Sequence, residues 1–384
     1  MRSSKYGLRI ECADREVAPD WVRAHVPVEW IERYGERLYH ERLPKEEEER
    51  KQYANQVGAD GWMLLDALQA LDTPDWIKTL PAISTLCTIW EQQFEAREQG
   101  GQWRQEPVLP AAQLINSPYD LDARYGKKRT TLWVGYKVHL TQTCDEDAPQ
   151  LITHVETTQA PISDEGVLSA IHTGLSQKDL LPEQHLVDAG YVTSANLVKT
   201  SSSYGVDLVG PTLKTHWYQA ETGYDLTHFS IDWDAQTVTC PQGRRSSSWT
   251  PVQDAGKSLI KVKFSQSDCQ VCPSRTSCTG TTRRSMTLHP KEQMKALFAA
   301  RQRESTDAFK TTYRHRAGIE GTHSQAVRAM GLRRSRYIGL RKTHLGHVAI
   351  AAAVNVIQLI SWLRGEVPEQ TRTSPFKLVM KQAI

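Results

Sequence analysis

An alternation of predicted strands and helices constrains the fold of this chain most. Residues 132–140 (LWVGYKVHL) alternate apolar and polar side chains as a half-buried strand does. Ser163 precedes two acidic residues and an apolar run, which predicts a helix whose first turn is capped by the Ser163 side chain. The predicted order is strand, strand, helix, strand, helix, strand over residues 132–140, 151–157, 163–175, 185–188, 194–201 and 206–210. This order indicates an α/β fold with mixed strand pairing.

The residues before this alternation are predicted to be helical. Leucines and isoleucines over 15–100 recur at the spacing of one helix face, and the charged run 45–51 (KEEEERK) is typical of an exposed helix. Residues 98–118 are rich in Gly, Gln and Pro, which indicates a linker. We therefore expect a first part, 1–116, made of a helical region and a linker, and a second part, 117–211, that begins the α/β core.

The residues after the alternation divide into a β-rich part and a helical part. A hairpin is predicted from 228–232 and 237–240, and a strand from 259–264. Helix returns from Lys291 to about Met330, with interruptions expected near Ser305 and Gly318. The boundaries we expect are 212–290 for a β-rich insert and 291–384 for a helical second half of the core.

The apolar segment 345–363 is long enough to raise the question of a membrane span. Its composition includes polar side chains that are costly in hydrocarbon, namely His347, Asn355, Gln358 and Ser361. We therefore expect a buried core helix here and no membrane partner. No signal peptide opens the sequence, so the expected compartment is the cytoplasm.

Four of the seven cysteines lie within the β-rich part, at Cys240, Cys269, Cys272 and Cys278. Two thiolates separated by two residues can hold one side of a tetrahedral Zn²⁺, and a second pair closes the site. The quartet therefore predicts structural zinc, with buried or redox-active thiols as the alternative. The odd total and the missing signal peptide are unlike a disulfide framework.

The charge of the chain is unevenly distributed. The formal net charge is only +3, but residues 301–345 contain eleven basic and three acidic residues, which leaves −5 for the remainder. A local basic stretch can bind nucleic-acid phosphates even when the total charge is small, although a solvated helix face is the alternative. The candidate DNA contacts in this stretch are Arg328, Arg333, Arg334 and Arg336.

Two carboxylates are candidates for a catalytic metal site. Asp188 ends a predicted strand, a position where α/β sheets place functional groups. Tyr313, Arg316 and Glu320 are spaced by three and four residues, so we expect them on one helix face. An acid on a strand opposite an acid on a basic helix suits phosphoryl transfer with a divalent metal.

These motifs together resemble those of bacterial insertion-sequence DDE transposases. His185-Leu-Val-Asp-Ala-Gly-Tyr191 and the Tyr313-x2-Arg316-x3-Glu320 pattern look like the second and third acidic motifs of that family, in the group with a cysteine-rich insert between them. The similarity runs from about Val17 to the C-terminus. It implies a ribonuclease-H-like mixed-sheet core with an N-terminal helical region and a β-rich insert whose four cysteines form a zinc-type site.

The resemblance also implies an activity and partners. The family cuts and joins DNA with two Mg²⁺ or Mn²⁺ ions held by three carboxylates. Asp188 and Glu320 would be two of the metal ligands, and Tyr313 and Arg316 would contact phosphate. The expected partners are the element's terminal repeats and target DNA, with a homodimer in the DNA complex, and the protein would associate with the bacterial nucleoid when bound.

The first carboxylate of the family has no clear counterpart here. In the family it lies in an Asp-Ser-Thr or Asp-Gly-Thr strand, and this sequence contains neither tripeptide. The resemblance therefore implies an N-terminally truncated transposase, which loss of the first Asp could inactivate, with Asp120 and Asp122 as candidate substitutes. The alternatives are a non-catalytic zinc-containing DNA-binding remnant and a ribonuclease-H-like nuclease.

Overall fold

The computed structural model describes residues 19–34, 44–97, 100–107, 109–110, 112–213 and 222–366. The chain divides into two compact units, each assembled from three stretches. Unit 1 contains Met1–His139, Val155–Ile162 and Ala326–Ala353, and unit 2 contains Leu140–His154, Ser163–Gln325 and Val354–Ile384.

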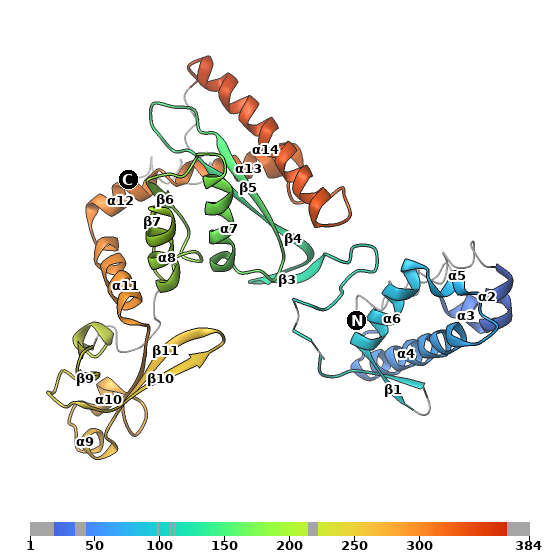
Figure 1. Cartoon of the computed structure of the whole chain (residues 1–384), viewed down its shortest axis with the longest axis horizontal. Helices are drawn as coiled ribbons and strands as arrows, with labels where there is room; N and C mark the ends of the chain where they lie inside the picture. The colour runs from blue at the N-terminus through green and yellow to red at the C-terminus, as the bar shows by residue number, and fades with distance from the viewer. Residues whose placement is uncertain are drawn as a thin grey trace, which may run out of the picture. The chain divides into compact units, whose positions relative to one another are not determined.

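The N-terminal region is a small helical bundle, as predicted, that ends in a hairpin (Figure 1). Its helices are α2 (Pro19–His25), α3 (Glu29–Tyr34), α4 (Glu47–Gln69), α5 (Asp75–Lys78) and α6 (Pro81–Gln93). The core forms where α6 meets α4: Trp90 is fully buried and donates from its indole to the backbone oxygen of Gly58 at 3.1 Å. The exposed residues at the start of α4 confirm the prediction for 45–51.

The end of this region differs from the prediction. Two short strands, β1 (Phe94–Arg97) and β2 (Gly100–Trp103), pair antiparallel where we expected helix and linker. Phe94 is fully buried against the helices, so the apolar spacing that continues from α6 marks core contacts and not a longer helix.

The α/β region contains both kinds of strand pairing, but in separate sheets. An antiparallel sheet has the order β3-β4-β5, from β3 (Arg124–Lys128), β4 (Thr131–Gln142) and β5 (Ile152–Gln159). A parallel pair joins β6 (Gln184–Leu186) to β7 (Asp207–Val209). Helix α7 (Asp164–Ser176) leads to β6, and α8 (Ser194–Tyr204) connects β6 to β7. The predicted mixed α/β class is confirmed at this level.

Two local expectations in this region need correction. Ser163 has the extended backbone of an N-cap residue, but its side chain accepts no capping hydrogen bond. A side-chain cap is present instead at the start of α8, where the Thr193 hydroxyl accepts a hydrogen bond from the amide of Asn196 at 3.2 Å. Strand β3 was absent from the prediction because Arg124–Lys128 has almost no apolar side chain to alternate.

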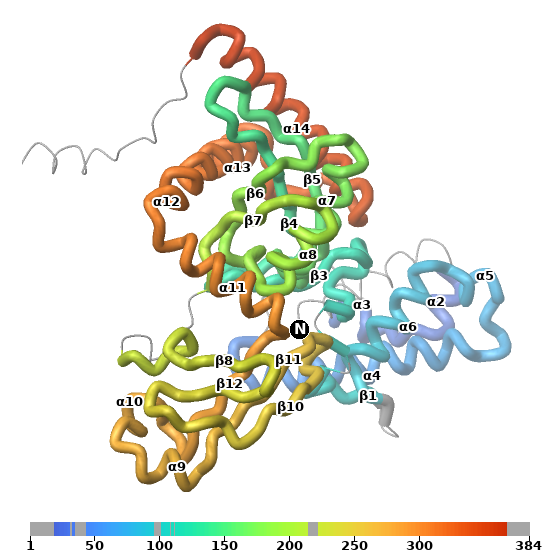
Figure 2. The backbone as a smooth tube through the Cα atoms, turned by 60° about the vertical axis from the view of Figure 1, so that its left-hand side comes forward, coloured from blue at the N-terminus to red at the C-terminus, as the bar shows by residue number. Residues whose placement is uncertain are grey.

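The segment 222–290, the expected β-rich insert, contains five of the strands (Figure 2) and contributes most of a separate apolar cluster. It contains the predicted hairpin β8 (Ser230–Asp232) and β9 (Thr237–Thr239), a three-stranded antiparallel sheet, and two short helices, α9 (Gln266–Gln270) and α10 (Arg275–Cys278). The sheet order is β10-β11-β12, from β10 (Ser246–Asp254), β11 (Lys257–Phe264) and β12 (Ser285–Leu288). Val238, Val262, Phe264 and Leu288 are almost completely buried in its apolar cluster.

The C-terminal part is helical, with α11 (Lys291–Glu304), α12 (Asp307–Arg314), α13 (Ala317–Met330) and α14 (Leu340–Leu363). The first predicted interruption falls at Ser305–Thr306, as expected. The second lies at His315 and Arg316 rather than at Gly318, because the amides of His315 and Arg316 bond three residues back and tighten the chain there.

Helix α14 was expected to be a buried core helix, and this was wrong. One face is buried at Thr343, His347, Ala351 and Val354, but many of the other side chains are exposed, and only 17% of the most apolar window is buried. The exposed apolar side chains include Leu345, Val356, Ile360 and Leu363. Among the described residues, α14 is the one helix long and apolar enough to span a membrane by length and composition. An apolar sequence alone does not distinguish a covered helix from an uncovered one.

Candidate functional site

Asp188 lies in a tight turn directly after β6. The parallel pairing extends one residue beyond the strand, since the amide of Val187 donates to the oxygen of Val209 at 2.8 Å. The chain then turns, and the amide of Tyr191 donates back to the oxygen of Asp188 at 3.0 Å. This geometry leaves the Asp188 side chain 58% exposed at the end of the strand, where α/β sheets hold functional groups.

Tyr313, Arg316 and Glu320 do not share one continuous helix, contrary to our expectation. Tyr313 lies on α12, Arg316 in the break, and Glu320 in the first turn of α13. The three side chains still gather. The Arg316 guanidinium lies 5.9 Å from the centre of the Tyr313 ring, and it forms an ion pair with Glu320 at 3.1 Å.

Arg316 connects the two candidate metal ligands. One terminal nitrogen lies 2.7 Å from a carboxylate oxygen of Asp188, and the other lies 3.1 Å from a carboxylate oxygen of Glu320. The Arg316 side chain is only 18% exposed, whereas Glu320 is 72% exposed. The structure therefore brings the carboxylates of Asp188 and Glu320 to the guanidinium of Arg316.

Tyr313 fixes the position of this cluster. Its hydroxyl donates to the oxygen of Val187 at 3.3 Å, and its ring stacks on Phe309 at 5.4 Å. Burial raises the pKa of the Tyr313 phenol, so the hydroxyl remains a donor. The strand end that carries Asp188 is thus tied to the helix that precedes Arg316.

A further acid beside this turn was missed by the sequence prediction. A Cβ placed on Gly190 would lie 3.0 Å from a carboxylate oxygen of Asp164, so this carboxylate packs against the turn. Burial raises the pKa of Tyr191, and the charges of Asp164 and Asp188 raise it further. In sequence, Asp164 is one of the two acidic residues of the first turn of α7. The packing of α7 against the turn is a tertiary contact. The one sequence feature that indicates it is the glycine at position 190, where a side chain would meet Asp164.

Two histidines connect strand β6 to α7: His172 is fully buried and His185 is half-buried. The Nε2 atom of His172, on α7, is 3.0 Å from Nδ1 of His185, on β6. Burial lowers the pKa of His172 to about 4, and burial together with the neighbouring His172 lowers that of His185 to about 4. Both rings are therefore neutral at physiological pH.

Asp120 and Asp122, the candidate substitutes for the first carboxylate, are both engaged within unit 1. Asp120 accepts from the Tyr136 hydroxyl at 2.7 Å and from the amides of Asp122 and Ala123 at 3.2 Å. Asp122 accepts from the amide of Leu340 at 2.9 Å, at the first residue of α14. Asp188 and Glu320 belong to unit 2. The assignment of Asp120 or Asp122 as a metal ligand remains a prediction.

The predicted DNA-binding arginines lie in and beside the loop between α13 and α14. Arg333, Arg334 and Arg336 are exposed there, and Arg328 is exposed on α13. Tyr337 and Ile338, in the same loop, are 52% and 63% exposed. The loop is held by the Ser335 hydroxyl, which donates to the oxygen of Tyr337 at 2.8 Å. Exposed cations beside an exposed aromatic ring suit contact with nucleic acid.

The four cysteines of the insert gather in one place without forming a ligand set. Cys240, Cys269 and Cys278 pack against the apolar cluster of the insert. Burial raises the pKa of Cys278, and the other three thiols of the quartet raise it further. No group of three or more His, Cys, Asp or Glu side chains in the described part of the chain could hold a metal ion. The geometry does not support the zinc prediction.

Comparison with known proteins gives one match. The family model described as "Transposase DDE domain" matches residues 239–360, about a third of the chain. The matched region contains the cysteine quartet, Tyr313, Arg316 and Glu320, and it does not reach Asp188. No curated protein and no solved structure matches the sequence. The match supports a DDE transposase and suggests DNA as its partner.

Proposed function

We propose that this chain is the transposase of a bacterial insertion sequence, which cuts and joins DNA with divalent metal ions. The observation that carries the proposal is that Asp188 and Glu320 both form ion pairs with Arg316. Glu320 lies within the region that matches the transposase family, whereas Asp188 precedes that region, so the fold brings together two acids that are far apart in sequence. The ribonuclease-H-like core is part of this proposal. The parallel β6–β7 pair with Asp188 at its end is consistent with it.

Two carboxylates that meet at one cation fit a Mg²⁺ or Mn²⁺ ion. Mg²⁺ usually takes one or two carboxylates from a protein and completes its shell with water and substrate phosphate. Asp188 and Glu320 would hold the ion, and it would stabilise the charge on the attacking and leaving oxygens of the phosphodiester.

The roles of the neighbouring side chains follow from their contacts. Arg316 neutralises both carboxylates and presents a planar donor that can instead bind a phosphate oxygen. Tyr313 holds the Asp188 strand end through Val187 and places its ring beside the guanidinium. We propose both as DNA phosphate contacts, with Arg328, Arg333, Arg334 and Arg336 binding the flanking backbone in a homodimeric complex.

The non-catalytic alternative is favoured by one observation. No third acid in the described residues joins Asp188 and Glu320 as a metal-binding group. A DNA-binding remnant would keep affinity for DNA and have no metal-dependent cleavage.

One experiment separates these functions. The full chain is incubated with plasmid carrying the sequences that flank its gene, with Mg²⁺, Mn²⁺ or EDTA, and nicking is followed on gels. We expect metal-dependent nicking that falls about 1000-fold in Asp188→Asn and in Glu320→Gln. The matched control Glu292→Gln, an exposed acid on α11, should retain full activity. Wild-type binding without nicking would establish the remnant, and undiminished nicking by Asp188→Asn would overturn the site.

Zinc in the insert is a separate part of the proposal. It is supported by the resemblance and by the gathering of the four thiols around Cys278, and the ligand geometry does not add support. Metal analysis of the purified chain under reducing conditions tests it, with Cys269→Ser/Cys272→Ser as the comparison. Less than one zinc per two chains in the wild type would reject it.

A further inference from the structure

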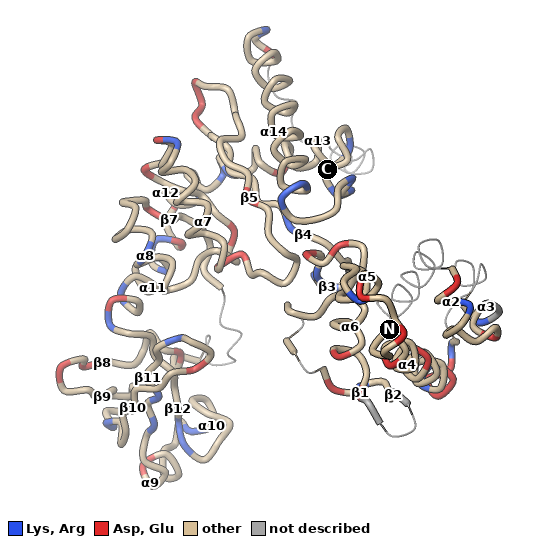
Figure 3. Tube along the Cα trace, turned by 45° about the vertical axis from the view of Figure 1, so that its right-hand side comes forward, with Lys and Arg blue, Asp and Glu red and all other residues tan. Residues whose placement is uncertain are grey.

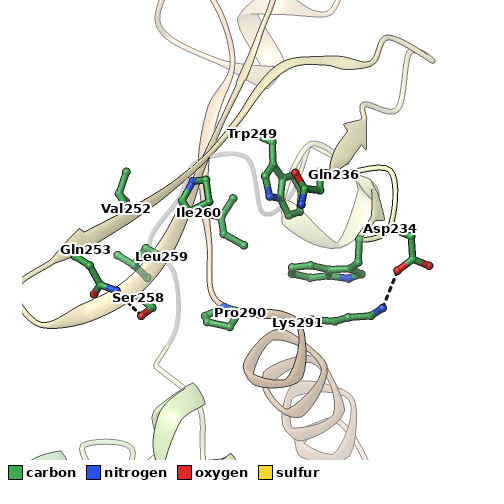
Figure 4. A pocket seen from close by; sticks show the side chains of 12 residues that line it. Asp234, Gln236, Trp249, Val252, Gln253, Ser258, Leu259, Ile260, Pro290 and Lys291 are labelled. Carbon is green, nitrogen blue, oxygen red and sulfur yellow. Dashed lines mark hydrogen bonds and ion pairs between the residues drawn. The ribbon is translucent and has the colours of Figure 1, made fainter.

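The three-stranded sheet of the insert has two chemically different faces. Trp249, Ile260, Val262 and Leu288 share one face, because directly paired residues in antiparallel strands point to the same side. That face is part of the apolar cluster, and its Trp249 and Ile260 line a cavity of about 560 Å³, which Val252 and Leu259 of the opposite face also line (Figure 4). Pro290 and Lys291, at the start of α11, line the same cavity, and Lys291 reaches Asp234 at 3.3 Å.

The opposite face carries two rows of polar side chains across all three strands. In one row Lys261 of β11 lies between Thr250 of β10 and Thr287 of β12. In the next row Lys263 lies between its paired residues, Ser248 and Ser285. Each lysine on the central strand is thus flanked on both sides by a hydroxyl residue. The two rows are about 7 Å apart along the strand.

This face is open to solvent and electropositive. Lys261, Lys263, Thr250 and Thr287 are all exposed. Neither Lys261 nor Lys263 forms an ion pair with any residue that the structure describes, in contrast to Lys257, which pairs with Glu165 at 3.0 Å. Residues 239–290 contain eight basic and two acidic residues, a net charge of +6. Figure 3 shows Lys and Arg positions along this part of the chain.

We propose that the face of the β10–β11–β12 sheet formed by Ser248, Thr250, Lys261, Lys263, Ser285 and Thr287 binds the sugar–phosphate backbone of DNA. Lysine amines and Ser or Thr hydroxyls are donors that proteins use for phosphate oxygens, and they carry no base preference. The face would therefore position DNA without reading its sequence. This inference rests on the proposed function, which supplies DNA as the partner.

The test measures DNA binding by the full chain as a function of salt. Fluorescence anisotropy with a labelled duplex gives the slope of log K against log[salt] between about 50 and 200 mM. We expect Lys261→Gln/Lys263→Gln to reduce the slope by about 1.8 and to weaken binding about tenfold at the upper salt concentration, since each lost phosphate contact removes about 0.9 from the slope.

A control pair removes the same charge from the same unit. Lys199→Gln/Lys295→Gln changes exposed lysines on α8 and α11 and should stay within twofold of the wild type. The variant Thr250→Val/Thr287→Val keeps β-branched side chains and removes only the hydroxyls. It should weaken binding about threefold and leave the salt slope unchanged.

The outcomes separate this inference from the proposed function. A wild type that fails to bind DNA removes the premise and contradicts the proposed function itself. A wild type that binds, with Lys261→Gln/Lys263→Gln indistinguishable from the control pair, overturns the inference alone and leaves the transposase proposal standing. Melting curves of all variants confirm that folding is retained, since the substituted positions are exposed.

Discussion

Asp188 and Glu320 are bound to the two terminal nitrogens of one guanidinium group, that of Arg316, at 2.7 and 3.1 Å. The two acids come from a strand end and from a helix that are far apart in the chain. A cation placed between two exposed carboxylates would compete with a metal ion that they bind, so under the proposed function we expect Arg316 to have opposite effects on metal affinity and on catalysis.

The first prediction concerns Arg316→Gln. Loss of the competing charge should tighten Mn²⁺ binding at the site several-fold, whereas nicking should fall about 100-fold because the phosphate donor is lost. Titration of Mn²⁺ by electron paramagnetic resonance and the plasmid assay measure the two effects. Stability should change by less than about 1 kcal/mol, because both partner acids are more than half exposed. Weaker Mn²⁺ binding in Arg316→Gln would contradict the shared site.

The second prediction separates two roles of Asp122. Its carboxylate accepts from the amide of Leu340 at the start of α14. Asp122→Ala should lower the free energy of unfolding by about 1 kcal/mol, as loss of a helix cap does. Asp122→Asn keeps an acceptor oxygen and should retain both stability and nicking. Nicking lost in Asp122→Asn with unchanged stability would instead make Asp122 a metal ligand.

The third prediction concerns the exposed loop between α13 and α14. Replacing Arg333, Arg334 and Arg336 with Gln should reduce the salt slope of DNA binding by about 2.7 if each contacts one phosphate. Thermal stability should not change, since all three side chains are exposed. A slope equal to that of the wild type would place the DNA elsewhere.

The fourth prediction is a dependence of stability on pH from His172 and His185. Their pKa in the folded state, about 4, is below the unfolded value of 6.5, so the unfolded state binds more protons between these values. Stability should be full above pH 6.5 and fall as the pH is lowered toward 4, by about 1.4 kcal/mol per pH unit for each ring.

Urea denaturation at several pH values measures this dependence. His172→Asn should reduce the slope of the free energy of unfolding against pH between about pH 6 and 4.5. Part of that slope should remain, because burial also lowers the pKa of His347 to about 4. A slope that is unchanged by His172→Asn would refute the assignment to this pair.

The fifth prediction tests the core of the helical region. A Cβ at Gly61 would lie 1.9 Å from the indole of Trp90, which is fully buried. Gly61→Ala should therefore destabilise the protein by about 2 kcal/mol through overpacking, although alanine favours helix. Gly321→Ala, where the added carbon meets open space on α13, is the matched control and should not lower the urea midpoint.

The sequence allowed the main elements of the α/β region to be predicted. Strands β4, β5 and β11 were found because apolar and polar residues alternate along them. Strands β3, β10 and β12 were missed, since their side chains are mostly polar or their runs are short. These strands are stabilised by hydrogen bonds to neighbouring strands, and the composition of one strand does not indicate which strand it pairs with.

The finer geometry of the site depends on tertiary contacts that spacing does not encode. The spacing of Arg316 and Glu320 predicts their contact, and it contains no information on the contact between Arg316 and Asp188. The cap supplied by Asp122 comes from a remote segment for the same reason. The exposure of α14 could not be predicted either, because composition reports what a helix can bury and not what covers it.

The division into two compact units has a consequence for how this protein can be cut or interrupted. The chain passes from one unit to the other at Leu140, Val155, Ser163, Ala326 and Val354, and β4, β5, α13 and α14 each belong to both. A premature stop codon or frameshift before Ala326 would remove the last stretch of each unit, Ala326–Ala353 of unit 1 and Val354–Ile384 of unit 2. Neither unit can therefore be obtained as a continuous fragment by deletion from one end of the chain.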